Sequence, residues 1–379
     1  MRIVLLYLKW SYGIEVLADQ LSRQFERIAQ VSIVAGAKPD FKPGMRASWQ
    51  EGHLDSALAL FNPLVQVRLL REIRANDPQV IYFISPHVLN VPLVLLCRWF
   101  THAVVISHIH DPEYAGRPLV AATANTVARL QSRWSHRVFC WGNAIKEAIS
   151  RDFTVPTDRI AVFAHGPGHK TPADRSGAGP GGAAPRYFSL IGTIIPRKGV
   201  EYFLEAARLF NERYGTDAAG FLLAGYGDLT AYHAAIDMLP NLQVVNRFVE
   251  DAEVNEFLAN SYALVLPYTA GVMQSSLIAI AYGNGCPVIV SNLGSLPEEV
   301  EVGRTGYVVE KANAVQIADA MTRIYADPER ARRREDCLAT YRERFNWDTI
   351  ADQMYRDMES AVRQLEGKHG LARQVSEDR

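Results

Sequence analysis

The chain has 379 residues, a formal net charge of −1 and a composition that is 48% hydrophobic and 21% charged. This length allows two domains of ordinary size, each with its own core. A net charge near zero creates no global field toward nucleic acid, so we expect no nucleic-acid partner. The four cysteines lie far apart without a CxxC spacing, which favours buried thiols in a reducing, cytoplasmic compartment.

The apolar segments are too short to predict a leader or a membrane span. The N-terminal sequence MRIVLLYLKWSYG has neither the long apolar run nor the small-residue cleavage site of a signal peptide, and it predicts a first strand. The longest mostly apolar run, residues 88–96, is stopped by Arg98. A spanning helix needs about 20 such residues, so we expect at most a peripheral membrane contact.

Strands and helices alternate through the first half of the chain. Strands are expected at residues 3–7, 31–34, 80–84, 103–108, 138–140 and 160–163. Helices are expected at residues 14–28, 63–76, 89–100, 119–135 and 143–152. In the first of these helices Leu17, Leu21 and Phe25 recur at a spacing of four, which is typical of an amphipathic helix. Repeated strand–helix units predict an α/β fold with a parallel, doubly wound sheet.

A segment rich in Gly, Pro, Ala and Ser, HKTPADRSGAGPGGAAPR at residues 169–186, predicts a linker. The strand–helix pattern then restarts. Strands are expected at residues 187–191, 220–224, 242–245, 263–266 and 288–290. Helices are expected at 200–214, 229–236, 251–259 and 314–325, with a further apolar helix between the last two strands. We therefore predict domains at 1–168 and 187–345.

The C-terminal residues 327–364 form a charged helical region that is interrupted near Phe345, Asn346 and Trp347. We assign residues 346–379 to a final helix and tail. The basic run that starts at Ala331 is short and holds no aromatic residues, which favours a solvated helix face over a nucleic-acid patch.

Two glycine-rich turns follow strands of the second domain. The sequence GTIIPRKG begins at Gly192 and brings Arg197 and Lys198 beside a helix start, which suits a diphosphate. The alternative is an ordinary surface turn with two solvated cations. The sequence AGYGD around Gly225 lacks the third glycine and the distant acidic residue of a dinucleotide site, so we reject a nicotinamide cofactor.

A third loop precedes the apolar helix, where Met273, Gln274, Ser275 and Ser276 lie at the expected helix start. A helix N-terminus at the carboxyl end of a parallel strand offers unpaired N–H groups and a positive dipole end, which suit a phosphate. The alternative is simple capping by Ser275 or Ser276, which needs no ligand.

Four stretches together resemble glycosyltransferase family 4 in order and spacing. They are IGTIIPRKGVEYFLEAARLF, FLLAGYGD, NRFVEDAEVNEFLANSYALVLPY and GNGCPVIVSNLGSLPEEVEVGRTGYVV. The resemblance implies the GT-B fold, in which two Rossmann-like domains face a cleft and the C-terminal helix crosses back to the N-terminal domain. It also implies a retaining transferase that uses a nucleotide sugar, here a UDP- or GDP-sugar, without a metal ion or other cofactor. The chain has no Asp-x-Asp motif and no cluster with metal-ligand spacing.

The resemblance assigns donor residues with two departures. Lys198 matches the diphosphate-binding lysine, while Thr193 stands where the family has an arginine, with Arg197 the nearest substitute. The family's E-x7-E glutamates, which contact sugar and ribose, fall at Val272 and Ile280. The sequence instead resembles a sub-branch in which loop amides and the Gln/Ser side chains of residues 273–276 hold the phosphates.

Other residues complete the expected site. Asn246 or Arg247 would border the base, and Gly13 lies in the first loop, where the acceptor binds in the family. His110 in the sequence HIHD matches a histidine near the reaction centre, and Asp111 could orient it or bind an acceptor hydroxyl. The alternative is that His110 is a structural histidine at a strand end.

These observations predict a metal-independent hexosyltransferase acting on a saccharide or a polyprenyl-diphosphate-linked acceptor in surface polysaccharide or glycoconjugate synthesis. The missing glutamates leave a second hypothesis, a non-catalytic GT-B homologue that serves as a partner subunit or binding module. Basic residues on the helices predict either solvated faces or a docking surface for the anionic inner face of the cell membrane. They are Arg68, Arg71, Arg74, Arg117, Arg129, Arg133, His136 and Arg137.

Overall fold

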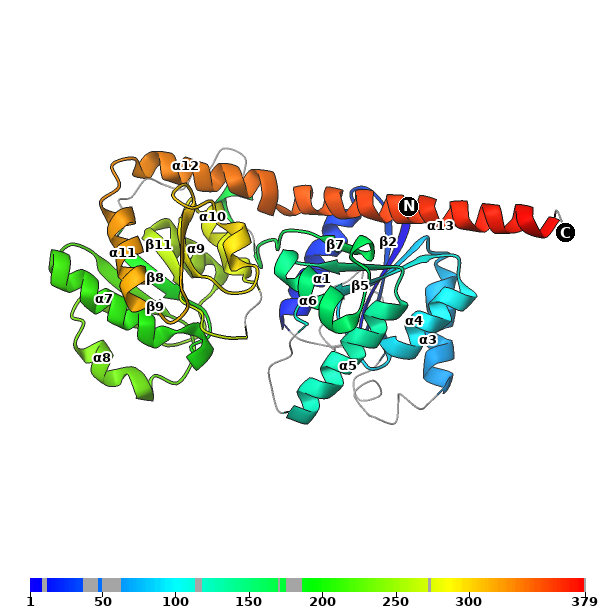
Figure 1. Cartoon of the computed structure of the whole chain (residues 1–379), viewed down its shortest axis with the longest axis horizontal. Coiled ribbons are helices and arrows are strands. Elements are labelled where there is room, and N and C mark those ends of the chain that lie inside the picture. The colour runs from blue at the N-terminus through cyan, green and yellow to red at the C-terminus, as the bar shows by residue number, and fades with distance from the viewer. Residues whose placement is uncertain are drawn as a thin grey trace. The chain divides into compact units, whose positions relative to one another are not determined.

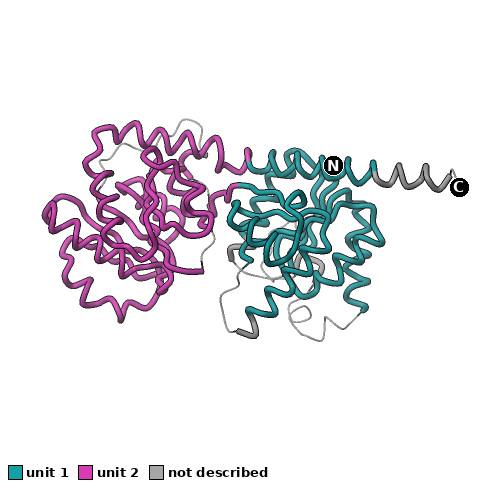
Figure 2. The backbone as a smooth tube through the Cα atoms, in the orientation of Figure 1, with its two compact units in different colours: residues 1–163, 350–379 teal, residues 164–349 magenta. Residues whose placement is uncertain are grey.

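The computed structural model describes residues 1–8, 12–36, 47–49, 63–112, 118–169, 171–174, 186–271 and 274–377. The chain divides into two compact units (Figures 1 and 2). Unit 1 comprises Met1–Phe163 and Ile350–Arg379, and unit 2 comprises Ala164–Thr349. Within the described residues, no helix is long and apolar enough to cross a bilayer.

The described part of unit 1 contains a seven-stranded sheet whose paired strands are all parallel, in the order β3-β2-β1-β4-β5-β6-β7. The strands are β1 (Arg2–Tyr7), β2 (Gln30–Gly36), β3 (Ala47–Trp49), β4 (Val80–Phe83), β5 (Val104–Ile109), β6 (Arg137–Cys140) and β7 (Ile160–Val162). The order reverses between β1 and β4. Ligands of such sheets bind beyond the carboxyl ends of the strands at this kind of switch.

Alternate strand residues and two helices form one half of the unit 1 core. Val4, Leu6, Ile81 and Phe83 pack in one apolar cluster with residues of α3 (Pro63–Ala75) and α4 (Asn90–Phe100). The remaining helices of this unit's N-terminal part are α1 (Tyr12–Phe25), α5 (Pro118–Trp134) and α6 (Asn143–Phe153). Strands buried on both faces explain the nearly continuous apolar runs in the sequence.

The described part of unit 2 contains a six-stranded parallel sheet in the order β10-β9-β8-β11-β12-β13. The strands are β8 (Tyr187–Ile191), β9 (Gly220–Ala224), β10 (Leu242–Val245), β11 (Ser261–Leu266), β12 (Val288–Ser291) and β13 (Gly306–Val309). One apolar cluster joins the sheet to α7 (Val200–Tyr214) and α11 (Ala314–Tyr325). A second cluster joins it to α9 (Asp251–Ala259), α10 (Ser276–Gly283) and the Cys337–Phe345 region.

The C-terminal region contains the predicted interruption. Helix α12 (Arg330–Thr340) continues into a π-helical turn, Tyr341–Phe345, and α13 (Trp347–Glu377) follows. Asn346 between them is extended, and its Oδ1 accepts a hydrogen bond of 2.8 Å from the Thr349 N–H, which caps the new helix. Within unit 1, Arg137 at the start of β6 forms a bidentate ion pair with Asp357 of α13.

Several element boundaries differ from the sequence prediction. Strands β3 and β13 were not expected, and α13 runs beyond the predicted end at residue 364. The helix expected at 229–236 is two pieces, a 3-10 turn at Thr230–Tyr232 and the short α8 (His233–Asp237). Most of the predicted linker, residue 170 and residues 175–185, lies outside the described residues.

Candidate functional site

Three loops of unit 2 interlock at the carboxyl edge of the sheet, beginning with the two glycine-rich turns. Gly192 follows β8 with φ +121°, and Gly225 follows β9 with φ +150°. A Cβ on Gly225 would lie 1.8 Å from the Gly192 carbonyl oxygen, and one on Gly227 would lie 2.1 Å from that of Ile194. Such distances are impossible for real atoms, so the close approach of the two turns requires glycine.

The turn after β8 also packs against the end of β11. A Cβ on Gly199 would lie 1.9 Å from the carbonyl oxygen of Pro267. The Thr269 N–H donates to the Arg197 carbonyl at 3.0 Å, and the Arg197 guanidinium donates to the Gly271 carbonyl. These contacts hold the 3-10 turn Pro196–Lys198 beside the loop that leads to α10.

Lys198 lies at this junction as a half-buried cation. Its Nζ is 3.7 Å from the centroid of the Tyr268 ring, which is close enough for a cation–π interaction. Among the described residues, no carboxylate pairs with this ammonium group. An unpaired cation fixed by an aromatic ring is suited to receive an anion.

The N-terminus of α10 is the third part of this edge. Ser275 occupies the N-cap position with extended φ and ψ of −148° and 117°, but its side chain makes no capping hydrogen bond. Its Oγ lies instead 3.4 Å from the Tyr268 hydroxyl. The Ser275 side chain therefore does not cap α10, which was the alternative to a ligand role. The first N–H groups of α10 have no side-chain acceptor from the N-cap residue.

Gln274 and Ser276 flank this N-cap residue. The Oε1 of Gln274 is buried and has no hydrogen-bond partner among the described residues, an arrangement that a ligand donor would satisfy. A Cβ on Gly168 would lie 3.8 Å from the Ser276 Oγ, so this serine faces the 164–169 segment of the same unit. Met273 and Val272 lie outside the described residues.

The position of the family's second glutamate is closed to ligands. Ile280 is 3% exposed and belongs to the apolar cluster that joins α9 and α10 to the sheet. A ribose contact from this position is therefore replaced by core packing.

Asn246 and Arg247 are both engaged with their own surroundings. The Asn246 Oδ1 accepts from the Gly227 N–H and its Nδ2 donates to the Gly227 carbonyl, each at 3.1 Å. Arg247 forms a bidentate ion pair with Glu253, at 2.6 and 2.9 Å, and this pair lowers the pKa of Glu253 to about 2. Both side chains thus stabilise the loops around the expected base site, and a base contact stays a prediction.

Two aromatic residues at this edge were not predicted as site residues from the sequence. Tyr226, two residues after β9, is 71% exposed, and Phe248, three residues after the neighbouring β10, is 61% exposed. Exposed aromatic rings can stack on a nucleobase, so they are the better candidates for base contacts. The sequence could have indicated both residues, because each is an aromatic residue in a polar turn that follows an apolar strand.

In unit 1, His110 directly follows β5 at the carboxyl edge of the sheet, and both of its ring nitrogens are engaged. The Trp141 indole N–H donates to the His110 Nδ1 at 3.1 Å. Because Nδ1 accepts, Nε2 carries the proton and donates to the Ile84 carbonyl at 2.7 Å. The geometry therefore assigns the neutral Nε2–H tautomer.

A buried aromatic cluster supports this imidazole. The His110 ring stacks on His108 with centroids 4.5 Å apart, and the Tyr82 hydroxyl lies 2.5 Å from the His108 Nδ1. Burial lowers the pKa of His110 to about 4, opposed in part by the hydrogen bond to Ile84. A group with this pKa is a poor general base near neutral pH.

The other sites predicted in unit 1 have simpler placements. Asp111 follows His110 beyond β5, and Gly13 lies in the first turn of α1, at the carboxyl edge of β1. In unit 2, Thr193 is exposed in the turn after β8 and supplies no positive charge. The catalytic role of His110 and Asp111 and the acceptor role of Gly13 stay predictions.

The basic residues predicted for a membrane surface do not form one free face. Arg117 lies outside the described residues, Arg137 pairs with Asp357, and the His136 Nδ1 accepts from the Val105 N–H at 2.9 Å. Within the described residues, no group of three or more His, Cys, Asp or Glu side chains could hold a metal ion.

Two doubly wound parallel α/β units, each with polar loops at its carboxyl edge, define the GT-B architecture. Comparison with family models then places the chain. The model described as Glycosyltransferase Family 4 matches residues 12–166, and the model described as Glycosyl transferases group 1 matches residues 185–327. The chain therefore belongs to the family 4 glycosyltransferases, as its motifs predict.

Individual relatives are distant. An alpha-maltose-1-phosphate synthase of Mycolicibacterium smegmatis is 28% identical over 187 residues, which cover 44% of this chain and 45% of that relative. The chain thus spans less than half the length of this relative. A GDP-mannose-dependent alpha-(1-6)-phosphatidylinositol monomannoside mannosyltransferase of Mycobacterium tuberculosis is 23% identical over 79% of this chain and 80% of its own length.

Solved structures share the fold over nearly the whole chain. HepE of Anabaena in complex with UDP matches with a TM-score of 0.73 at 16% identity, covering 95% of this chain and 100% of that chain. The sucrose-phosphate synthase of Thermosynechococcus elongatus matches with a TM-score of 0.68 at 18% identity, over 95% and 100% of the two chains. These likenesses confirm the predicted GT-B fold.

Proposed function

We propose that the protein transfers a hexosyl unit from a nucleotide sugar to a saccharide or lipid-linked saccharide acceptor, with retention of configuration. The observation that carries this proposal is the anion-binding edge of unit 2. There an unpaired Lys198 lies beside an α10 N-terminus that Ser275 leaves uncapped. A diphosphate supplies the charge that both features lack.

The names of similar proteins support a nucleotide-sugar donor. HepE was solved with UDP and with UDP-glucose, and the mycobacterial mannosyltransferase is named for GDP-mannose. Tyr226 and Phe248 are the residues we assign to the base, since their rings are exposed at neighbouring strand ends. Val272 and Ile280 supply no carboxylate for the sugar or the ribose, so the selectivity for the sugar must come from other groups.

The chemistry follows from the charges present. An acceptor hydroxyl oxygen bonds to the anomeric carbon, and the bond from that carbon to the diphosphate breaks with its electron pair on the departing phosphate. Lys198 and the α10 dipole stabilise that developing charge, which is the main electrostatic demand of the step. The acceptor proton goes to the departing phosphate, because both nitrogens of His110 are already engaged. His110 then contributes as a neutral, fixed contact.

We also propose a peripheral membrane contact for unit 1. Helix α3 carries Arg68, Arg71 and Arg74, and its first turns expose Leu64 and Val67. Basic and apolar side chains on one short helix favour the surface of an anionic bilayer. Salt-sensitive binding to anionic vesicles, weakened by replacing Arg71 and Arg74 with Gln, tests this contact, and equal binding to neutral vesicles would remove it.

A panel of nucleotide sugars tests the transferase. The protein is incubated with each donor, and both thermal stabilisation and release of the nucleoside diphosphate are measured. Stabilisation and turnover by one donor support the proposal. Stabilisation without turnover on any acceptor would favour the alternative, a nucleotide-binding homologue without catalysis. The absence of carboxylates at Val272 and Ile280 supports this alternative.

A further inference from the structure

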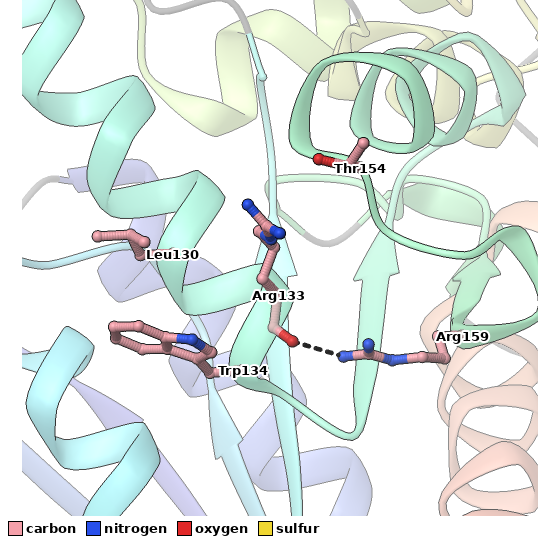
Figure 3. Close-up of a pocket in the computed structure, with 5 residues that line it drawn as sticks. All are labelled: Leu130, Arg133, Trp134, Thr154 and Arg159. Carbon is pink, nitrogen blue, oxygen red and sulfur yellow. Dashed lines mark hydrogen bonds between the residues drawn. The ribbon is translucent and has the colours of Figure 1, made fainter.

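A polar pocket lies in unit 1, away from the carboxyl edge of its sheet. It has a volume of about 550 Å³ and is lined by Leu130, Arg133, Trp134, Thr154 and Arg159 (Figure 3). These residues flank the first residues of β6 and β7, which begin at Arg137 and Ile160. The pocket is therefore at the amino-terminal edge of the sheet, opposite to the edge that carries His110.

Two arginines of this region are held by the carboxyl end of α5. Arg159 donates to the carbonyls of Arg133, at 3.0 Å, and Ser135, and Arg98 donates to the Trp134 carbonyl at 2.8 Å. Capping of the negative helix end explains why these cations gather here. Each guanidinium has five N–H donors, so the caps leave donors unused.

Arg133 and Thr154 have no such structural explanation. The Arg133 side chain points across the pocket toward Thr154 in Figure 3, and it makes no hydrogen bond with the described residues. Thr154 ends α6 in the left-handed region with φ 56° and ψ 40°. A β-branched residue is strained there, whereas glycine adopts this conformation readily.

The pocket also concentrates positive charge. Among the described residues, none of Arg98, Arg133 and Arg159 forms an ion pair with a carboxylate. Burial and then the like charge of Arg98 lower the pKa of Arg159, while the nearby Asp158 raises it. A bound anion would relieve this repulsion, and planar guanidinium groups match the oxygens of a phosphate.

We propose that this pocket binds the phosphate of a phosphate ester, with the organic part of the ligand resting on Trp134 and Leu130. Two sources share this chemistry, a phospholipid headgroup and a soluble phosphate ester. The lipid is favoured by Trp99 and Phe100, which follow Arg98 on α4 and are 71% and 53% exposed. Aromatic side chains beside arginines suit a bilayer interface. This site does not depend on nucleotide-sugar binding.

The test compares Arg133→Gln with a matched control, Arg129→Gln. Arg129 lies one turn earlier on α5, is exposed like Arg133 and does not line the pocket. Neither side chain makes a hydrogen bond with the described residues, so both variants should keep the wild-type melting temperature. Full-length proteins are titrated with glycerol 3-phosphate by calorimetry, and with phosphatidylglycerol or phosphatidylcholine vesicles by co-sedimentation.

We expect Arg133→Gln to weaken binding about 10-fold in at least one arm, and Arg129→Gln to leave it within about 2-fold. Thr154→Gly, which removes the hydroxyl and the strain, should raise stability and weaken the same binding. An effect in the soluble arm identifies a soluble ester, and an effect confined to phosphatidylglycerol identifies a headgroup. Absence of binding in both arms, or equal loss in the two arginine variants, would overturn the proposal.

Discussion

The neutral state of His110 makes a measurable prediction about pH and stability. Burial lowers the pKa of this imidazole to about 4 in the folded protein, against 6.5 as its ordinary value. As the pH falls, His110 therefore binds a proton in the unfolded chain at a higher pH than in the folded protein. The stability that comes from keeping His110 neutral is complete above pH 6.5 and is lost progressively between pH 6.5 and pH 4.

The magnitude follows from the two pKa values. The difference of about 2.5 pH units corresponds to about 3 kcal/mol below pH 4, at roughly 1.4 kcal/mol per unit. Between pH 7.5 and pH 5 the expected loss is about 2 kcal/mol from this residue alone. His110→Gln keeps a donor and an acceptor but cannot titrate, so its unfolding free energy should lack this component.

Urea unfolding of both proteins at pH 7.5, 6.5, 5.5 and 5.0 measures the effect. His102→Gln is the matched control, because His102 is an exposed histidine of the same unit. The wild-type protein and the control should lose about 2 kcal/mol more than His110→Gln over this range. Parallel pH profiles for wild type and His110→Gln would refute the reasoning, and so would an NMR titration of His110 near pH 6.5.

Two further predictions concern unit 2. Burial raises the pKa of Glu299 to about 8, so this carboxyl costs stability as the pH rises from 4.5 to 8. The free energy of unfolding of Glu299→Gln should therefore increase relative to that of wild type by about 3 kcal/mol between pH 5 and pH 8. Denaturant unfolding measures this difference, and equal pH profiles of the two proteins would contradict the assignment. Gly225→Ala, whose Cβ would meet the Gly192 carbonyl at 1.8 Å, should unfold at lower urea and lose nucleotide binding. Gly215→Ala, with φ +81°, ψ 163° and nothing within 4 Å, is its control: it introduces backbone strain of about 1–3 kcal/mol without an overlap and should keep nucleotide binding.

Most of the fold could be predicted from the sequence, because strands buried on both faces leave apolar runs that need no long-range information. The elements at residues 187–191, 200–214 and 251–259 lie where the periodicity puts them. Strand β13, with the sequence GYVV, was not predicted because its apolar run is short and directly follows a turn that contains glycine. The helix at 229–236 was predicted as one piece, although its polar, half-exposed sequence supports only two short turns.

The candidate site was predictable to the level of loops, and less so to the level of side-chain roles. The sequence places Lys198 and Ser275 at helix starts, since those positions depend on local signals. It does not indicate that Trp141 occupies one nitrogen of His110, or that Glu253 holds Arg247. Such contacts join residues that only the folded chain brings together. The pocket lined by Arg133 has the same origin, because its lining comes from α5, the end of α6 and the 3-10 turn Thr157–Arg159 before β7.

The central claim, a diphosphate site at Lys198, is tested most directly by calorimetric titration with UDP and GDP. Lys198→Ala removes the unpaired cation, whereas Lys311→Ala removes an exposed lysine beyond β13, three strands from β8. Loss of a charge-assisted hydrogen bond to phosphate is worth about 1.5–3 kcal/mol, so Lys198→Ala should weaken one of the two nucleotides about 10- to 100-fold. Lys311→Ala should bind as wild type does. Failure of both nucleotides to bind the wild-type protein, or equal affinities in the two variants, would contradict the account.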